Sequence, residues 1–555
     1  MKKFLTIALA AFAFIACNDN NIDDVTGGGV TGEMETSYIA INLNAADNTR
    51  AEGGVYQDGL PAERAVKSAY FFFFDAEGNA FPVTGSPATG EGQEGGINWI
   101  SANLQDLGQG EKPNVSDIKD AVLVLSTYVG DYPSQIVAVL NWVPTATTGY
   151  SLDALHDATD VYNSTVGGFV MSNAVYAKDG QEVVGTPLAE TDIFKSPADA
   201  LANPITIHVE RIAAKVTVTA KDGVVENRFQ VKKNSNNVSV TIGGTDIDVY
   251  VKVEGWALHN DFTQSKLLKD IDLTWGDNLG FTWNDAPYYR CYWAESLPLS
   301  AITDNAFPTA FGLELGSATN VTTGDGTYVD NTYTYVGENT LYDATSTANC
   351  TKVILKAKLQ QKTAENTYVD LPLARWYTTY YAGTKDLLKA VANTIKYQYC
   401  WEESGTYTYI SYEDLTVVQE GNLVKFQLSL NSEGKNWRVV NSDKTYTPKS
   451  KDEMNALLGG LEKALYYDEG DTLYYIDIAH LAYNNPGVQA GDYGVVRNHI
   501  YNVVLNSFGG FGSPVYVPDG NLEYPEDPTD VKDYVSAEVR ILSWRLVSQE
   551  VDVQP

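Results

Sequence analysis

Short segments in which apolar and polar residues alternate recur along nearly the whole chain. Alternation with a period of two residues is the pattern of a strand that buries one face. Segments rich in Ser, Gly, Asn and Asp separate these runs and predict frequent turns. A series of short strands without a regular alternation of strands and helices favours antiparallel sandwiches over a parallel sheet. We therefore predict an all-β protein with a few short helices.

The chain is too long for one ordinary domain, because 555 residues exceed the roughly 150 residues of a typical domain. The turn-rich segment 196–204 predicts a connector between two domains. Helices are predicted only at 384–392 and 452–465. Strands are predicted at 69–74, 121–129, 135–142, 205–219, 238–253, 352–359, 415–430, 472–478, 495–505 and 537–544.

The charge balance excludes one class of partner. Against 38 basic residues the chain has 71 acidic ones, a formal net charge of −33. Binding to nucleic acid needs a positive surface, so no nucleic acid partner is expected. A hydrophobic content of 44% argues against disorder, because it is enough to build cores.

The first seventeen residues have the features of an export signal. Lys2 and Lys3 precede the apolar run 4–16, which is too short to span a membrane and ends at Cys17. This ending is similar to a bacterial lipobox, in which the cysteine receives a lipid and becomes the first residue after cleavage. The alternative is a plain signal peptide cleaved near Cys17. Either interpretation takes the protein out of the cytoplasm.

A strand followed by an exposed loop comes next. Residues 18–37 are polar, acidic and Gly-rich, as expected of a tether. Ile39, Ile41, Leu43 and Ala45 then alternate with other residues and predict a half-buried strand. The loop 46–54 contains the bond between Arg50 and Ala51, and exposed loops of small polar residues are the places where proteases cut. Arg64 is the competing site, but it leads directly into the strand predicted at 69–74.

The C-terminal tail repeats the pattern of the N-terminal strand. The segment 513–530 is acidic and interrupted by prolines, which favours an extended linker. After it, Val535, Ala537, Val539 and Ile541 alternate with polar residues, as a strand requires.

No catalytic or metal-binding motif emerges from the sequence. The five histidines stand apart from one another, and the motif GxGxxG at 90–95 lacks the strand and helix that dinucleotide binding needs. The aromatic cluster at 283–293 suits a sandwich core, although such rings also stack on sugars. Among so many acids, a glycosidase pair of carboxylates stays an open alternative. We expect no cofactor, no metal and no enzymatic activity.

The cysteines beyond Cys17 are three, at Cys291, Cys350 and Cys400, so at most one disulfide can form among them. Their spacing matches no metal-binding pattern. We expect buried thiols, since cysteine packs as a small apolar residue.

Five segments, in this order along the chain, resemble the fimbrillins of Bacteroidales, specifically the shaft subunit of the short fimbriae. They are IVAVLN at 136–141, FVMSN at 169–173, VERIAAKV at 209–216, YGVVRNHIY at 493–501 and AEVRILSW at 537–544. The resemblance implies two transthyretin-like antiparallel β-sandwich domains and export as a lipoprotein. It also implies that an Arg-specific surface protease removes an N-terminal strand, and that a C-terminal strand of a neighbouring subunit fills the groove.

This assembly has a clear physical basis. A missing strand exposes unpaired N–H and C=O groups above an apolar floor, and a donor strand with alternating apolar residues satisfies both. Because donor and acceptor lie at different ends, the contact is head-to-tail and produces an open filament. The removable strand is then the one with Ile39, Ile41, Leu43 and Ala45, and the donor strand the one that begins at Val535.

The expected division is a signal with its lipobox at 1–17, a propeptide at 18–50, sandwich domains at 51–208 and 209–513, and a linker with the donor strand at 514–555. The expected place is a cell-surface fimbrium, with the precursor a lipoprotein at the outer membrane. Expected partners are further copies of the chain, anchor and tip subunits, the protease, and host or bacterial surface receptors. The alternatives are a tip adhesin of the same family or a surface lipoprotein that binds or hydrolyses glycans.

Overall fold

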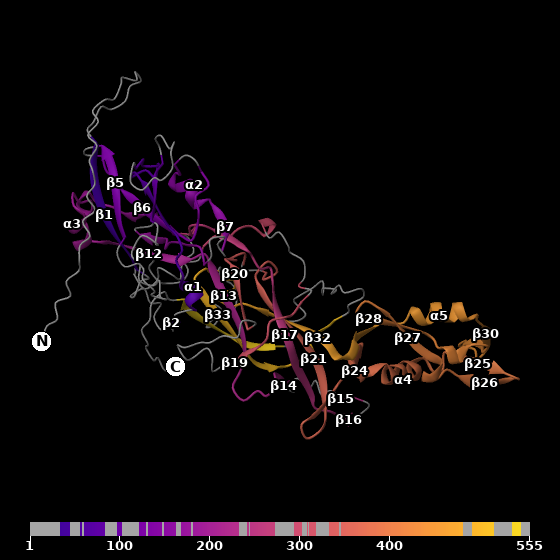
Figure 1. The fold of residues 1–555 in the computed structure, drawn as a ribbon. Helices are drawn as coiled ribbons and strands as arrows, with labels where there is room; N and C mark the ends of the chain where they lie inside the picture. Colours follow the sequence, from indigo (N-terminus) through magenta and orange to yellow (C-terminus); the bar gives the residue numbers. More distant parts are fainter. Residues whose placement is uncertain are drawn as a thin grey trace, which may run out of the picture.

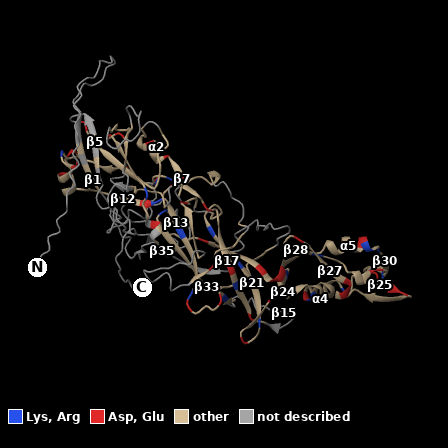
Figure 2. Ribbon diagram, in the orientation of Figure 1, with Lys and Arg blue, Asp and Glu red and all other residues tan. Residues whose placement is uncertain are grey.

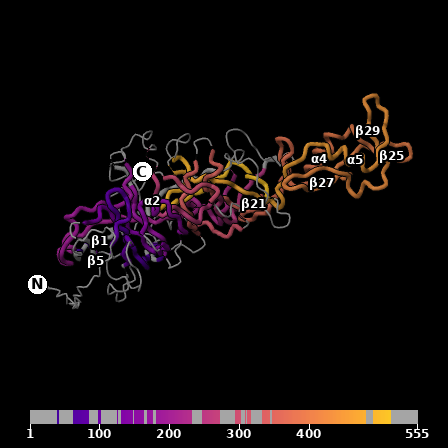
Figure 3. Tube along the Cα trace, turned by 90° about the horizontal axis from the view of Figure 1, so that it is seen from above, coloured from indigo at the N-terminus to yellow at the C-terminus, as the bar shows by residue number. Residues whose placement is uncertain are grey.

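Strands dominate the structure, a computed structural model, and the prediction of an all-β fold is confirmed. Three bodies follow one another along an elongated molecule, from the indigo N-terminal sheet to the orange module at the far end (Figures 1 and 3). The residues that the structure describes are 34–44, 56–57, 60–83, 97–102, 121–128, 131–146, 149–162, 168–178, 181–231, 241–242, 245–271, 273, 294–301, 308, 310–317, 332–342, 346–480, 491–515 and 535–544.

The first body is an 8-stranded sheet in which β11 (Thr186–Pro187) pairs with β6 beside the main path. The strand order along that path is β4 (Trp99–Ala102), β3 (Ala69–Phe74), β6 (Gln135–Leu140), β8 (Met171–Asn173), β12 (Ile205–Arg211), β1 (Met34–Asn44) and β5 (Ala121–Tyr128).

This sheet forms two layers because β12 serves both. The first half of β12 pairs with β1, and its last residues pair with β8. Side chains of β1 and β5 therefore face those of β3 and β6 across one core. The run Phe71–Phe74 in β3 is buried on both sides, since Phe71 and Phe73 lie in that core while Phe72 and Phe74 lie in a second one.

The second core joins the first body to the next. It contains Leu155 of α2 (Leu152–His156) together with Leu267, Leu268 and Ile271, which follow β18 (Gln264–Lys266). β18 itself pairs with β7 (Thr159–Val161) of the first body.

The second body packs two sheets face to face around the largest core. One sheet has the order β19 (Gly316–Ser317), β13 (Ala213–Ala220), β33 (His499–Phe508), β35 (Val535–Trp544) and β2 (Tyr56–Gln57), with β20 (Tyr333–Gly337) also on β13. The other has the order β14 (Arg228–Gln230), β17 (Val249–His259), β21 (Lys352–Ala364), β32 (Asp471–Asp477) and β34 (Ser513–Pro514), with β22 (Thr367–Asp370) on β21.

The third body, here called the distal module, is inserted between β21 and β32, which pair with each other. It has its own core of residues from 374 to 464. One sheet is β24 (Thr379–Ala382), β23 (Leu373–Trp376), β31 (Ala464–Tyr467), β28 (Leu423–Leu428) and β27 (Leu415–Glu420), and the other is β26 (Thr406–Tyr409), β25 (Tyr399–Glu403), β29 (Asn436–Val440) and β30 (Tyr446–Pro448). The helices α4 (Gly383–Ile395) and α5 (Lys451–Gly459) contribute buried leucines to this core.

The remaining described elements are short. They are α1 (Pro61–Arg64), α3 (Pro197–Ala202), β9 (Tyr176–Lys178), β10 (Gln181–Val183), β15 (Thr241–Ile242), β16 (Thr245–Asp246), η2 (Glu190–Asp192), η5 (Leu299–Ala301), η7 (Tyr412–Asp414), η8 (Leu430–Ser432) and η9 (Asp468–Gly470).

One predicted boundary was wrong, and two predicted segments contain more structure than their patterns indicated. The helix predicted at 452–465 ends at Gly459, where a second glycine follows, and β31 occupies its last part. The run 415–430 is a hairpin of β27 and β28, because Gly421 adopts a positive φ at the turn. The connector 196–204 contains α3, whose first turn is capped by the Ser196 side chain.

Acidic and basic residues are interspersed along the described ribbon (Figure 2). Within the described residues, no helix combines the length and the apolar content needed to cross a bilayer.

Candidate functional site

The strand predicted to be removable lies inside the first sheet. β1 pairs antiparallel with β5 over Met34–Ile41 and parallel with β12 over Ile41–Asn44. Both of its edges are thus occupied for part of its length, and its place beside β5 and β12 is visible in Figure 1. Removing β1 would leave two rows of unpaired backbone groups facing each other.

The side chains of β1 are part of the core. Ile39 and Ile41 are both 0% exposed and pack in the core of the first body, while Leu43 is in backbone register with Ile207. The expectation of a half-buried strand was wrong, because Ala40 between the two isoleucines is also buried. The helix α3 lies against β1. Ala45, the fourth predicted residue, falls outside the described residues.

The predicted cleavage bond between Arg50 and Ala51 also falls outside the described residues, as does Cys17. The nearest described residues on either side of this bond belong to β1 and β2. β1 ends in the first body at Asn44, and β2 begins at Tyr56 beside the second body, where Tyr56 and Gln57 pair with the end of β35.

Arg64, the competing cleavage site, ends a helical turn that is anchored by a buried acid. Glu63 is 1% exposed, and its carboxylate accepts hydrogen bonds from the Leu60 amide at 2.6 Å and from Tyr335 Oη at 2.5 Å. Its Oε1 also lies 2.8 Å from Lys215 Nζ. The sequence offered a signal for this turn, because Pro61 at the first helical position followed by Glu63 is a helix-start pattern.

The predicted donor strand lies at the edge of the second body. β35 pairs antiparallel with β33 from Val535 opposite Phe508 to Ser543 opposite His499. Val539 is in register with Val503, and Ile541 is in register with Tyr501. Val503 and Tyr501 lie in the largest core. On its other side, β35 pairs within the described residues only with the two residues of β2.

One run of chain connects these two places. β12 pairs with β1, and after the single residue Ile212 the chain continues as β13, which pairs parallel with β33. The strand next to the removable strand, β12, and the strand that only β33 separates from β35, β13, are thus consecutive in the chain.

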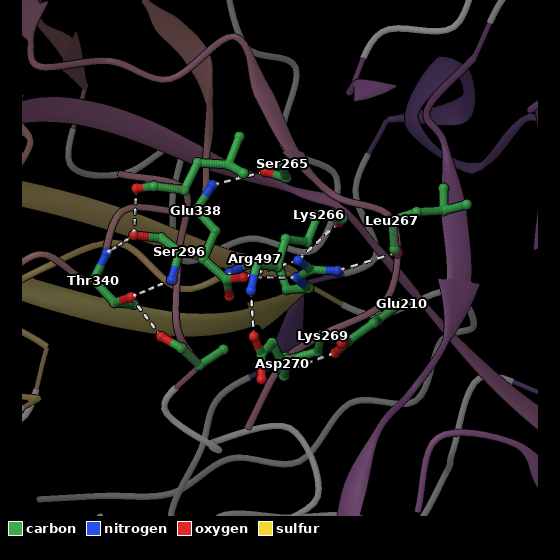
Figure 4. A network of polar contacts seen from close by, with 12 residues as sticks. Glu210, Ser265, Lys266, Leu267, Lys269, Asp270, Ser296, Glu338, Thr340 and Arg497 are labelled. Atoms are coloured by element: carbon green, nitrogen blue, oxygen red, sulfur yellow. Dashed lines mark hydrogen bonds and ion pairs between the residues drawn. The ribbon is translucent and has the colours of Figure 1, made fainter. Parts of the chain in front are cut away.

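Buried charges surround this crossing between the bodies (Figure 4). Arg497 is 0% exposed and donates from Nε and Nη2 to Glu338 Oε2 at 3.1 and 2.9 Å. Its guanidinium also donates to the backbone carbonyls of Lys266 and Leu267. Burial alone would raise the pKa of Glu338, but Arg497 and Lys269 outweigh it and hold that pKa below its ordinary value.

A second pair lies beside the first. Lys269 Nζ is 3.2 Å from Glu210 Oε2, and both side chains are buried. Burial raises the pKa of Glu210 although Lys269 and Arg497 oppose the shift. Burial lowers the pKa of Lys215, although the nearby Glu63 carboxylate acts to raise it. Charges taken out of water persist only when they are paired in this way, so the crossing is held in one arrangement.

Three side chains near this junction have the geometry of possible metal ligands. One atom each of His156, Glu182 and Asp270 lies within 4.8 Å of the others. Protein groups already occupy them: His156 Nε2 is 3.0 Å from the Lys269 carbonyl, Glu182 accepts from the Ile271 amide at 2.8 Å, and Asp270 pairs with Lys266. Burial lowers the pKa of His156, but Glu182 outweighs it and the net shift is upward.

Two of the three cysteines beyond Cys17 lie among the described residues. Cys350 and Cys400 are both buried, as predicted, and burial raises the pKa of the Cys400 thiol. Cys291, the motif at 90–95 and the aromatic cluster at 283–293 lie outside the described residues.

Comparison with known proteins bears on the C-terminal part of the chain. Residues 465–550 match the family model of the C-terminal region of fimbrillin, the type IV major fimbrial subunit protein. This part of the chain is fimbrillin-like. The matched stretch contains both β33 and β35, the strand pair at the edge of the second body. No curated protein matched the chain.

Solved structures that align with the chain come from Bacteroidales. A candidate cell adhesion protein from Parabacteroides distasonis ATCC 8503 is 12% identical with a TM-score of 0.40, over 92% of this chain and 98% of its own. A second one, from Bacteroides eggerthii DSM 20697, is 10% identical with a TM-score of 0.36, over 93% and 98%. The tip fimbrial protein Mfa3 from Porphyromonas gingivalis, with a C-terminal truncation, is 11% identical with a TM-score of 0.29, over 92% and 100%.

Proposed function

We propose that the chain is a structural subunit of the shaft of a cell-surface fimbria and polymerises head to tail by strand exchange. The observation that carries the proposal is the position of two strands. β1 is an internal strand of 11 residues, and β35 is a strand of 10 residues that pairs along one side with β33 and, within the described residues, on its other side only with the two residues of β2. The fimbrillin match of residues 465–550 supports it.

Removal of β1 creates the acceptor. The vacated groove is lined by core side chains that packed against Ile39 and Ile41, and exposing such a site costs about 1.5–3 kcal/mol for each lost side chain. The facing edges of β5 and β12 add unpaired backbone groups. A strand from a neighbouring subunit relieves both costs, which is β-augmentation.

The exchange is nearly balanced in backbone pairing. β1 makes eight residue pairs with β5 and four with β12, whereas β35 makes nine with β33 and two with β2. A precursor can therefore keep β35 on its own second body until an empty groove is available. The apolar floor of that groove then supplies the net driving force.

Processing prepares the subunit. In this proposal Cys17 carries the lipid that holds the precursor at the outer membrane, and an Arg-specific surface protease cuts between Arg50 and Ala51. The anchored turn at Glu63 supports this choice over Arg64, because a protease needs a segment that can leave its surroundings. Anchor and tip subunits would complete the fimbria, and surface receptors on host or bacterial cells would bind it.

Treatment of the purified precursor with an Arg-specific protease tests the proposal. Cleaved protein should form filaments in electron micrographs and SDS-resistant ladders on gels, and N-terminal sequencing of the filaments should begin at Ala51. A chain lacking residues 535–555 should be cleaved, stay folded and remain monomeric. Filaments from that truncated chain would contradict the donor assignment, and a sequence beginning at Ala65 would contradict the cleavage site.

A further inference from the structure

One sheet of the distal module carries exposed tyrosines on the face that is turned away from the core of the module. Its strands are β26, β25, β29 and β30 in that order. Tyr399, Trp437 and Val439 point to the core of the module. Because side chains alternate along a strand, the residues between them belong to the opposite face.

This opposite face, here called the tyrosine face, is defined by the strand register. Cys400 is paired with Tyr409 on one neighbouring strand and with Arg438 on the other. Glu402 is paired with Tyr407. Residues that are directly paired lie on the same face of the sheet, so all five belong to this face. On the far strand, Tyr446 is paired with Val440. Tyr397, which follows α4, packs its ring edge-on to Tyr409 with centroids 5.2 Å apart.

The rings of the tyrosine face pack on one another and are still accessible to solvent. Tyr407 and Tyr446 stack in parallel with centroids 3.9 Å apart, although their strands are the two outer strands of the sheet. Tyr397, Tyr407 and Tyr409 nevertheless remain 69%, 42% and 40% exposed. A soluble protein gains little from gathering several large rings in contact with water unless something binds there.

The polar groups of the face are planar and electrically balanced. Arg438 donates from Nε and Nη2 to Glu402 Oε2 at 3.1 and 2.5 Å, so its fork is held flat against a carboxylate. The pair carries no net charge, while the chain as a whole carries −33. An anionic ligand would find no excess of positive charge here.

We propose that the tyrosine face binds a neutral carbohydrate. Apolar faces of pyranose rings would lie on the tyrosine rings, while Arg438, Glu402 and the phenol groups would exchange hydrogen bonds with sugar hydroxyls. A few placed polar groups among aromatic surfaces are the usual composition of a small-molecule site. The face lies on the strands at the tip of the distal module, away from β1, β2 and β35 (Figures 1 and 3). Binding there therefore does not depend on the proposed assembly.

Calorimetric titration of the full chain with cellohexaose, laminarihexaose, chitohexaose and mannohexaose tests this site. We expect at least one of these neutral oligosaccharides to bind and the anionic probes heparin and polygalacturonate to bind less well. The double substitution Tyr407→Ala with Tyr446→Ala should weaken binding by about tenfold or more, the effect of losing two aromatic contacts.

The control is Tyr377→Ala in the same module, which removes a tyrosine that is 66% exposed and packs on Trp376 instead. It should leave the affinity unchanged, and circular dichroism should show that all variants are folded. Binding to none of the four neutral probes, tighter binding to the anionic ones, or equal affinity of the double variant and the wild type would each overturn the proposal. So would a light-scattering result in which the double substitution dissolves a dimer and affects nothing else.

Discussion

The buried pair of Arg497 and Glu338 gives the sharpest test of how the first two bodies are held together. The substitution Glu338→Gln keeps the shape of the side chain but leaves the guanidinium buried without its counter-charge. Both partners are at most 2% exposed in the structure. Breaking such a pair by removing one partner costs about 3–5 kcal/mol.

The matched control is the pair of Lys451 and Glu433. Its N–O distance is also 2.9 Å, but its side chains are 41% and 63% exposed. Because solvent screens exposed pairs, Glu433→Gln should cost less than about 1 kcal/mol. The two pairs share this N–O distance and differ in burial, although Glu338 also accepts hydrogen bonds from Nε and the backbone amide of Arg497.

Hydrogen exchange is the appropriate assay, because a chain built from several bodies is not expected to unfold in one step. The amides of Ile212 and Asn498 donate to the carbonyls of Val170 and Ala213, respectively, at the junction. Glu338→Gln should speed their exchange by roughly two to three and a half decades, at about 1.4 kcal/mol for each decade. Amides of β25 and β29 in the distal module should keep their rates and serve as the reference.

Equal effects of Glu338→Gln and Glu433→Gln would refute the reasoning. A second check uses the double variant Glu338→Leu with Arg497→Met. Apolar replacement of both partners removes the uncompensated charge, so this variant should exchange more slowly at the junction than Glu338→Gln alone.

Three further outcomes are expected. Cys17→Ser should abolish lipid labelling and surface fimbriae, so labelled fimbriae in that variant would contradict the lipid site. Ile541→Asp should shorten filaments seen by electron microscopy without unfolding the monomer, because a carboxylate in an apolar groove costs several kcal/mol. Since the pKa of His156 is raised in the fold, its stabilising contribution is complete below the unfolded pKa of about 6.5 and is lost as the pH rises through the folded value. Thermal scans between about pH 6 and pH 8 should thus show a decline at the junction that His156→Gln removes, and equal slopes would contradict it.

Local pattern was enough to predict most strands but not their partners. The alternation at 205–219 predicted one strand, and the backbone is indeed extended from Ile205 to Ala220 apart from Ile212. Nothing in that pattern could show that the two halves belong to different bodies. That division depends on pairing with β1 and β33, which lie far away in the sequence.

The distal module was missed for a related reason. The whole module lies between β21 and β32 in the sequence, and these two strands pair with each other in the fold. This long-range pairing marks the module as an insertion, and local sequence patterns do not show it. The tyrosine face escaped detection because Tyr407 and Tyr446 come together only through the sheet. The buried Glu63 had a weak signal in the preceding Pro61, but its partner Lys215 could not be foreseen.

The unbroken passage from β12 into β13 also determines how the molecule responds to pulling. A flexible linker between the first two bodies would stretch before either body felt the force. Here the covalent backbone transmits tension at once, and the six residue pairs between β13 and β33 run along the strands, so their hydrogen bonds are sheared together instead of being opened one after another. In a fibre assembled as proposed, we expect tension to pass through β12 and β13 from one body to the next.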